Sequence, residues 1–285
     1  MNHGSAGWGY GSLSDVPLLV AGIVAAIAYM RSAKAVTAHH PTQPWRTSHS
    51  WLFMIGLGLA LVVTTGPVGY AAMTHFSIHM VQHIVLMMVA TPLLVMGAPV
   101  LLILRAVTRE RRRSWVRLLR SRMFAIVTNP ILAWFAFATV LVGIHFTPAM
   151  SWLMDAGPVG RYAEIALYMG VAFAFYYTLL PGNPARNRPA PAFRVLSLFL
   201  MMIPETMTGF FIYSASVPLF PHFEQAATAL GVNALSDQQL GGALMWSGAM
   251  IIDVVWIAVA VSEWFDSESW KTLRMDARIA ARVDK

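Results

Sequence analysis

The sequence predicts an all-α fold, a polytopic integral membrane protein built as a bundle of seven transmembrane helices. The 285 residues are 57% hydrophobic and 12% charged, with a mean hydropathy of +0.60, whereas an average soluble domain has about 25% charged residues. Apolar windows close to the roughly 20 residues that cross a bilayer recur along the chain. Basic residues also alternate from loop to loop, which predicts the orientation of the helices.

Seven apolar windows define the predicted helices, and the polar stretches between them are too short for a separate soluble domain. Pro92 and Pro99 are expected to bend the long third window. The start of the chain lacks the basic residues of a secretory signal peptide, so we expect the first span to be retained. We divide the chain into a tail over 1–15, a membrane domain over 16–265 and a tail over 266–285. The seven windows are 16–36, 50–66, 78–104, 124–147, 162–180, 193–214 and 239–263.

Lysine and arginine predict the orientation, because short loops that carry them stay in the cytoplasm. Nineteen of the twenty basic residues lie on one side, in segments 31–50, 105–122 and 181–194 and after residue 263, and Arg161 is the exception. The N-terminus is therefore expected outside and the C-terminus in the cytoplasm. The cluster at 105–122 is expected to lie against anionic membrane lipid. We expect no binding of nucleic acid, although the net charge of +7 is also typical of phosphate-binding proteins.

Several classes of chemistry are disfavoured by the residues present. Cysteine is absent, which excludes disulfides, thiolate metal ligands and cysteine nucleophiles. Ser77 and other serines near the histidines have no evident acid partner, and no phosphate-binding glycine loop follows a strand. The window 239–263 contains no lysine for a retinal Schiff base. We therefore expect a protein that is not an enzyme and whose soft metal ligands are methionines.

The stretch "THFSIHMVQHIVLMM" at 74–88 places His75, His79, His83 and Met87 four residues apart. On a helix such residues share one face, and the stripe would span ~18 Å, so a neighbouring pair can share an ion but the whole stripe cannot. His83 lies about two turns inside the apolar span, where an ionisable side chain usually has a function. We predict a ligand or proton role for His79 with His83, whereas His75 is explained equally well as an interfacial residue.

Further candidates share the outer side. His145 is the natural partner of the His79/His83 pair, and His222 lies in a stiff outer loop, "PLFPHF". Glu164 can support a histidine ligand through a hydrogen bond, and Asp237 can cap the last helix. Methionines, including Met87, also gather toward the outer half, and imidazole with thioether but no thiolate favours copper, particularly Cu(I).

The terminus Met1-Asn2-His3 is a second candidate copper site. A free amine with a histidine at the third position can bind Cu(II) in square-planar geometry, which copper favours.

Four segments together resemble the CtaG family of membrane proteins, which is associated with assembly of caa-type cytochrome c oxidase. The resemblance covers about residues 50–265 and implies a multi-pass protein of the bacterial cytoplasmic membrane that helps to deliver copper. Implied partners are cytochrome c oxidase subunits or copper chaperones. The implied site residues are His79, His83, His145, Met245 and Asp237. The segments are "HMVQHIVLMMVATPLLVMGAP" (79–99), "GIHFTPAM" (143–150), "LFPHF" (219–223) and "DQQLGGALMW" (237–246).

One departure from the family pattern concerns the fifth helix. Members tend to have a Glu-His pair there, whereas here Glu164 is followed by Ile165. The resemblance therefore implies that this chain binds metal with a reduced ligand set or recruits His75 or His222.

Two other functions stay open at this point. Histidines on facing helices, such as His83 and His145, can ligate haem from both sides, which would make the protein a membrane electron carrier. Glu205 and Asp253 lie near the middle of the sixth and seventh windows. Acidic residues at such depth are typical of ion pathways, so a transporter of copper or protons is the other alternative.

Overall fold

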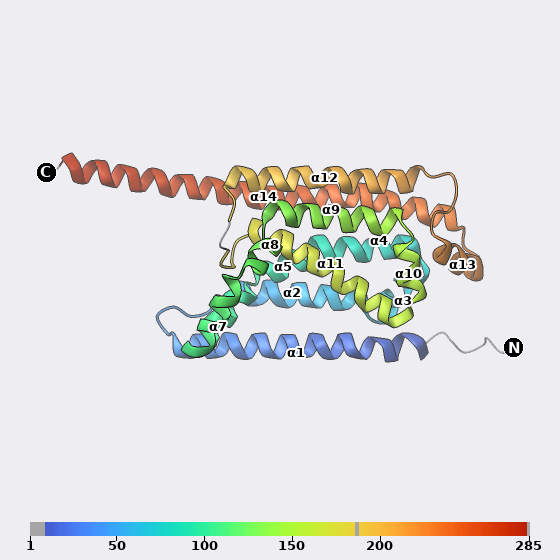
Figure 1. The fold of residues 1–285 in the computed structure, drawn as a ribbon, viewed down its shortest axis with the longest axis horizontal. Helices are drawn as coiled ribbons and strands as arrows, with labels where there is room; N and C mark the ends of the chain where they lie inside the picture. Colours follow the sequence, from blue (N-terminus) through green and yellow to red (C-terminus); the bar gives the residue numbers. More distant parts are fainter. Residues whose placement is uncertain (1–8, 186–187, 284–285) are drawn as a thin grey trace.

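The computed structural model describes residues 9–185 and 188–283, and within these ranges the chain forms helices and no strand. The helices run side by side in one elongated bundle, and the two ends of the described chain lie at opposite ends of it (Figure 1). The elements are α1 (Gly9–His39), α2 (Thr47–Thr64), α3 (Gly66–Thr74), α4 (Phe76–Ile84), the π-helix η1 (Val85–Ala90), α5 (Thr91–Met96), α6 (Pro99–Ala106), α7 (Arg109–Leu119), α8 (Arg122–Val127), α9 (Pro130–Phe146), α10 (Ala149–Asp155), α11 (Gly157–Leu179), α12 (Pro191–Ser214), α13 (Pro221–Leu230) and α14 (Ala234–Val283).

Five helical segments in the described part of the chain are long and apolar enough to cross a membrane. They are Leu13–His39, Thr47–Thr64, Phe76–Ala106, Pro191–Ser214 and Ala234–Ser269, and α9 with α10 makes a sixth if this pair, bent by 75°, is one span. Each predicted window coincides with helix. The window 162–180 falls on α11, which is not among these candidates, because Arg161, Glu164 and several tyrosines make it more polar. The prediction of seven spans therefore stays a prediction.

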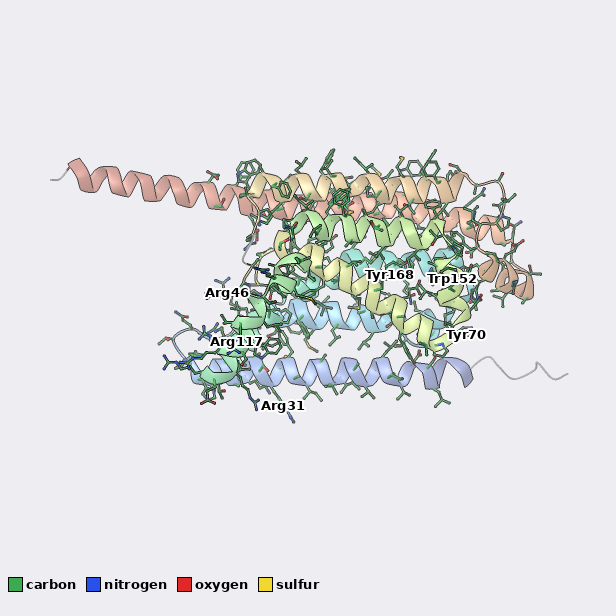
Figure 2. The ribbon with its side chains drawn as sticks, in the orientation of Figure 1. Arg31, Arg46, Tyr70, Arg117, Trp152 and Tyr168 are labelled. Atoms are coloured by element: carbon green, nitrogen blue, oxygen red, sulfur yellow. The ribbon has the colours of Figure 1, made fainter. Side chains whose placement is uncertain are left out.

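The short helices gather at the ends of the bundle. The helices α3, α10 and α13 cover one end, whereas α7 lies across the other end beside α1 (Figure 1). Figure 2 shows Arg31, Arg46 and Arg117 at the α7 end, Tyr70 and Trp152 at the opposite end, and Tyr168 between them. Large apolar side chains such as Trp51 and Ile251 are exposed on the long helices, as a hydrocarbon environment requires.

The long third segment is broken at Gly97–Pro99, where Ala98 takes a left-handed conformation with φ 50°. A helix end leaves its last carbonyl groups without partners, and here three donors from elsewhere in the chain satisfy them. Asn183 donates to Val95 O at 2.7 Å, and Tyr29 donates to Gly97 O at 2.7 Å. A ring nitrogen of His49 lies 2.8 Å from Met96 O. The break before Pro99 is thus stabilised by three other segments, whereas Pro92 lies inside α5.

Arg161, the one basic residue predicted on the outer side, is buried in an ion pair. Its guanidinium lies 3.0 Å from Asp15 Oδ1, and both side chains are 5% exposed. Asp15 also accepts from Gly66 N at 2.6 Å, and Arg161 donates to the carbonyl of Thr64. The pair therefore ties α1 and α11 to the turn between α2 and α3.

Candidate metal centre

His79 and His83 on α4 and Glu164 on α11 bring their polar atoms together inside the bundle. His79 Nε2 lies 3.4 Å from Glu164 Oε1, and His83 Nε2 lies 3.3 Å from the same oxygen. The three ligand atoms lie within 4.8 Å of one another, and all three side chains are buried. The four-residue spacing on α4 predicted the pairing of the two rings. Glu164, which we expected to support a histidine ligand, lies in the group itself.

A helix break next to the group orients the first histidine. In an unbroken helix Phe76 N would donate to Ala72 O, but α3 ends at Thr74 and α4 begins at Phe76. The freed carbonyl of Ala72 lies 3.1 Å from His79 Nδ1. A ring nitrogen that faces a carbonyl oxygen carries the proton, so His79 presents the lone pair of Nε2 to the group.

The freed amide of Phe76 is capped from another part of the chain. Asp237 on α14 accepts from Phe76 N at 2.6 Å and from Ser77 Oγ at 2.5 Å. We expected Asp237 to cap its own helix, and this is wrong: Asn233 accepts from Ser236 N at 2.9 Å there. Asp237 instead holds the first turn of the helix that carries His79 and His83.

A third histidine, His145, lies beside His83. Neither ring nitrogen of His83 has a hydrogen-bond partner, and its ring packs on Tyr168 at 4.2 Å between centroids. His145 lies 5.6 Å from His83 by the same measure, and its Nδ1 is 2.6 Å from Leu141 O. His145 Nε2 is buried and without a partner. His145 is therefore adjacent to the group, with one ring nitrogen free.

The electrostatics of this arrangement favour a cation. His79 Nε2, His83 Nε2 and Glu164 Oε1 are all buried without a well-aligned hydrogen bond. A buried polar group that lacks a hydrogen bond is costly. A proton or a metal ion held between these atoms removes that cost. Imidazole nitrogens with one carboxylate oxygen are a ligand set that transition metals bind.

Two histidines predicted as candidates lie outside the group. The predicted continuous stripe is wrong, because His75 is the N-cap of α4 with extended backbone, and its Nδ1 lies 3.0 Å from Thr74 Oγ1. His222 Nε2 lies 3.1 Å from Met73 O on α3. The next residue, Phe223, packs its ring against His79 at 5.1 Å between centroids. The helix α13 thus covers the group with an aromatic ring rather than a ligand.

Ile165, at the position where the family pattern has histidine, is buried in an apolar cluster with Leu86. Because neither His75 nor His222 joins the group in the described structure, the reduced ligand set is the alternative that this geometry favours. The terminal candidate Met1-Asn2-His3 lies outside the described residues.

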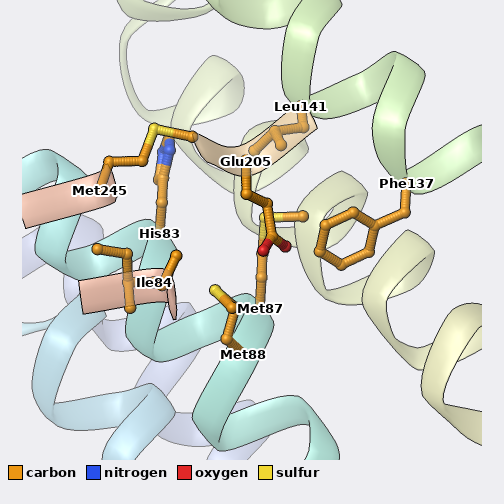
Figure 3. A pocket seen from close by; sticks show the side chains of 9 residues that line it. His83, Ile84, Met87, Met88, Phe137, Leu141, Glu205 and Met245 are labelled. Carbon is orange, nitrogen blue, oxygen red and sulfur yellow. The ribbon is translucent and has the colours of Figure 1, made fainter. Parts of the chain in front are cut away.

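The predicted methionines line a small cavity next to His83. Met87 on η1 and Met245 on α14 border it together with Glu205 on α12, and Figure 3 shows these side chains around it. The cavity has a volume of about 20 Å³, enough for one water molecule or one ion and too small for a porphyrin. The cavity therefore offers no room for a porphyrin on the methionine side of His83.

Several residues around the group were missed by reasoning from sequence. Tyr168 and Phe223 pack on the histidine rings, and Trp256 donates from its indole to Met88 O at 2.6 Å within the π-helix. Tyr168 follows Glu164 by four residues, which places both on one face of α11 and was the available signal. A π-helix has no comparable sequence signal.

The comparisons with known proteins agree with the motifs. The family described as cytochrome c oxidase caa3 assembly factor matches residues 27–267, which confirms the resemblance. Uncharacterized proteins of Mycobacterium tuberculosis and Mycobacterium bovis are each 29% identical over 276 residues, which are 93% of this chain and 40% of the relative. A third, from Mycobacterium leprae, is 23% identical over 286 residues, 98% of this chain and 41% of the relative. The chain thus spans about two-fifths of the length of these curated relatives. No solved structure matches it.

Proposed function

This chain belongs to the cytochrome c oxidase caa3 assembly factor family, and from that premise we propose that it binds copper within its helical bundle and aids delivery of the metal to the oxidase. In this role copper is cargo rather than a catalytic cofactor, and the protein's contribution is to hold and release it. The observation that carries the proposal is the convergence of His79, His83 and Glu164, whose three facing ligand atoms are buried without a hydrogen-bond partner.

The neighbours of the group favour copper over other divalent metals. His145 Nε2 is a free imidazole nitrogen beside His83, and the Met87 and Met245 side chains line the adjacent cavity. Thioether with imidazole suits Cu(I), whereas magnesium and calcium prefer sets of oxygen ligands. Phe223 and Tyr168 exclude water from the rings, which favours retention of a weakly hydrated monovalent ion.

The position of the group fits delivery at the outer membrane face. We propose seven spans with the N-terminus outside and the C-terminus in the cytoplasm of a bacterial cell, so that α3, α10 and α13 lie at the outer surface. The basic helix α7 then lies at the cytoplasmic face against anionic lipid. A copper chaperone or an oxidase subunit would approach the α13 end, where Phe223 lies over His79.

Copper analysis of the protein purified in mild detergent tests this proposal. Wild type is expected to retain copper after gel filtration, and the His79→Ala/His83→Ala variant to lose it. The control is His222→Ala, because His222 contacts a backbone carbonyl outside the group and its loss should leave the copper in place. A Glu164→Gln variant removes the charge without changing the side-chain volume and should release copper as well.

Each variant should first elute as a single species, so that loss of metal is separated from loss of fold. The proposal fails if the double histidine variant binds as much copper as wild type.

A transporter is the second candidate function, because Glu205 and Asp253 are 2% and 1% exposed in the interior of the bundle. Flux measured in sealed vesicles separates the two. Copper that crosses the membrane in proportion to the amount of protein favours transport, whereas copper that stays bound without flux favours static holding.

A further inference from the structure

The ring of His83 differs from its two neighbours in having both nitrogens free. His79 and His145 each direct Nδ1 to a backbone carbonyl, which leaves Nε2 as their one ligand atom. In His83, Nδ1 and Nε2 are both buried and without a hydrogen-bond partner. Nε2 faces Glu164. The other nitrogen therefore has no partner either, and the His83 side chain also lines the small cavity beside the group.

The cavity beside His83 is lined by thioether and carboxyl groups from separate elements. His83 and Ile84 border it from α4, Met87 and Met88 from η1, Met245 from α14 and Glu205 from α12 (Figure 3). Met87 and Met245 are 2% and 4% exposed. Thioether sulfur is a weak acceptor for water but a good ligand for a soft metal ion.

Glu205 is the second independent sign of a ligand here. Both oxygens of the Glu205 carboxyl group are buried, and the carboxyl group of Asp253 on α14 is within hydrogen-bonding reach of the same side chain. No lysine or arginine lines the cavity in the described structure. A carboxylate in this place would balance the charge of a monovalent cation.

The π-helix directs the methionines to this cavity. It begins at Val85, directly after the α-helix that carries the histidines, and both Met87 and Met88 line the cavity. Trp256 donates to the carbonyl of Met88 at 2.6 Å, and Thr91 donates to that of Leu86 at 2.7 Å. The Leu86 carbonyl also accepts from Thr91 N, so these side chains add bonds to carbonyls of the wider turn and stabilise the irregular segment. Such π-helical turns occur frequently at functional sites.

We propose that this cavity is a second copper position, which binds Cu(I) through the thioethers of Met87 and Met245 and through His83, with the Glu205 carboxylate as counter-charge. This inference rests on the proposed function, because it takes the histidine group as the first position. Both positions border His83, whose neutral imidazole has one lone pair and therefore binds one of the two ions at a time; with both positions filled, His79 and Glu164 hold the first ion. An ion can then pass between the imidazole group and the thioether cavity by exchanging ligands around one ring, without returning to water.

Anaerobic titration with Cu(I), followed by X-ray absorption spectroscopy, tests the second position. Wild type is expected to bind two equivalents with sulfur in the first coordination shell. Met87→Leu/Met245→Leu conserves volume and should bind one equivalent without sulfur. The matched control is Met201→Leu, because Met201 is a buried methionine on α12 that does not line the cavity, and it should behave as wild type.

The complementary variants probe the two positions separately. His79→Ala/Glu164→Gln removes the first position and should keep one equivalent with sulfur ligation. Glu205→Gln should weaken binding of one equivalent at least tenfold in competition with a Cu(I) chelator. A wild type that binds one equivalent without sulfur overturns the second position and leaves the proposed function standing. A wild type that binds no Cu(I) overturns both.

Discussion

The contact between α12 and α14 predicts a large effect of one methyl group. Gly209 and Gly242 face each other there, and a Cβ added at Gly242 would lie 2.5 Å from Tyr213 N and 2.8 Å from Gly209 O. The first distance is roughly 0.9 Å short of ordinary van der Waals contact, which begins at 3.4 Å. Both neighbours are backbone atoms of a helix, so they cannot move aside as the end of a flexible side chain can.

The expected magnitude for Gly242→Ala follows from two opposing terms. Overpacking of a tight contact costs about 1–3 kcal/mol, and a clash with backbone puts this case at about 3 kcal/mol. Replacing glycine by alanine within a helix raises the free energy of unfolding by about 1 kcal/mol. We therefore expect Gly242→Ala to lower the free energy of unfolding by about 2 kcal/mol.

Gly170 on α11 is the matched control, because a Cβ there meets nothing within 4 Å. Gly170→Ala keeps the helical gain without the clash, so the two variants should differ by about 3 kcal/mol. Denaturant unfolding in detergent micelles, followed by tryptophan fluorescence, measures the difference. Equal stability of the two variants would refute the close approach of α12 and α14.

Three further substitutions test single contacts. Asp237→Ala should destabilise the first turn of α4 by about 1–2 kcal/mol through loss of its cap, measured as faster hydrogen exchange at Phe76; unchanged exchange would contradict the capping role. Arg161→Met should lower the free energy of unfolding by about 3–5 kcal/mol, because it leaves Asp15 buried and unpaired. The thermal midpoint should recover when Asp15→Leu is added. An Arg161→Met variant as stable as wild type would argue against a buried ion pair. Trp256→Phe should lower the free energy of unfolding by about 1–3 kcal/mol, because the Met88 carbonyl in the π-helix loses its donor. A melting temperature equal to that of wild type would count against a stabilising role of this hydrogen bond.

The parts of this molecule that follow a regular period were predictable from sequence. The apolar windows coincide with helix, and the four-residue spacing of His79 and His83 does place both rings at one carboxylate. Arg161, by contrast, was predicted as an outer loop residue and is a buried ion-pair partner of Asp15. Its partner lies 146 positions away in the sequence, and local patterns carry no information about pairs at such separation.

The helix breaks account for most of the remaining differences. The change at Thr74–Phe76 removes His75 from the predicted stripe and frees the carbonyl that orients His79. The π-helix then alters the position of Met87 relative to His83. Both changes depend on side chains from α14 that satisfy the freed backbone groups, so they are tertiary effects and no count along α4 could predict them.

The helix α14 therefore controls the histidine group from both sides. Asp237 caps the turn before the group, Met245 lines the cavity beside it, and Trp256 holds the π-helix after it. Their spacings of eight and eleven residues place all three within about 100° of one another around the helix. Because one continuous helix carries these three contacts, a shift of α14 along its axis would change them together: the Asp237 cap on α4, the position of the Met245 thioether and the hydrogen bond from Trp256 to the π-helix.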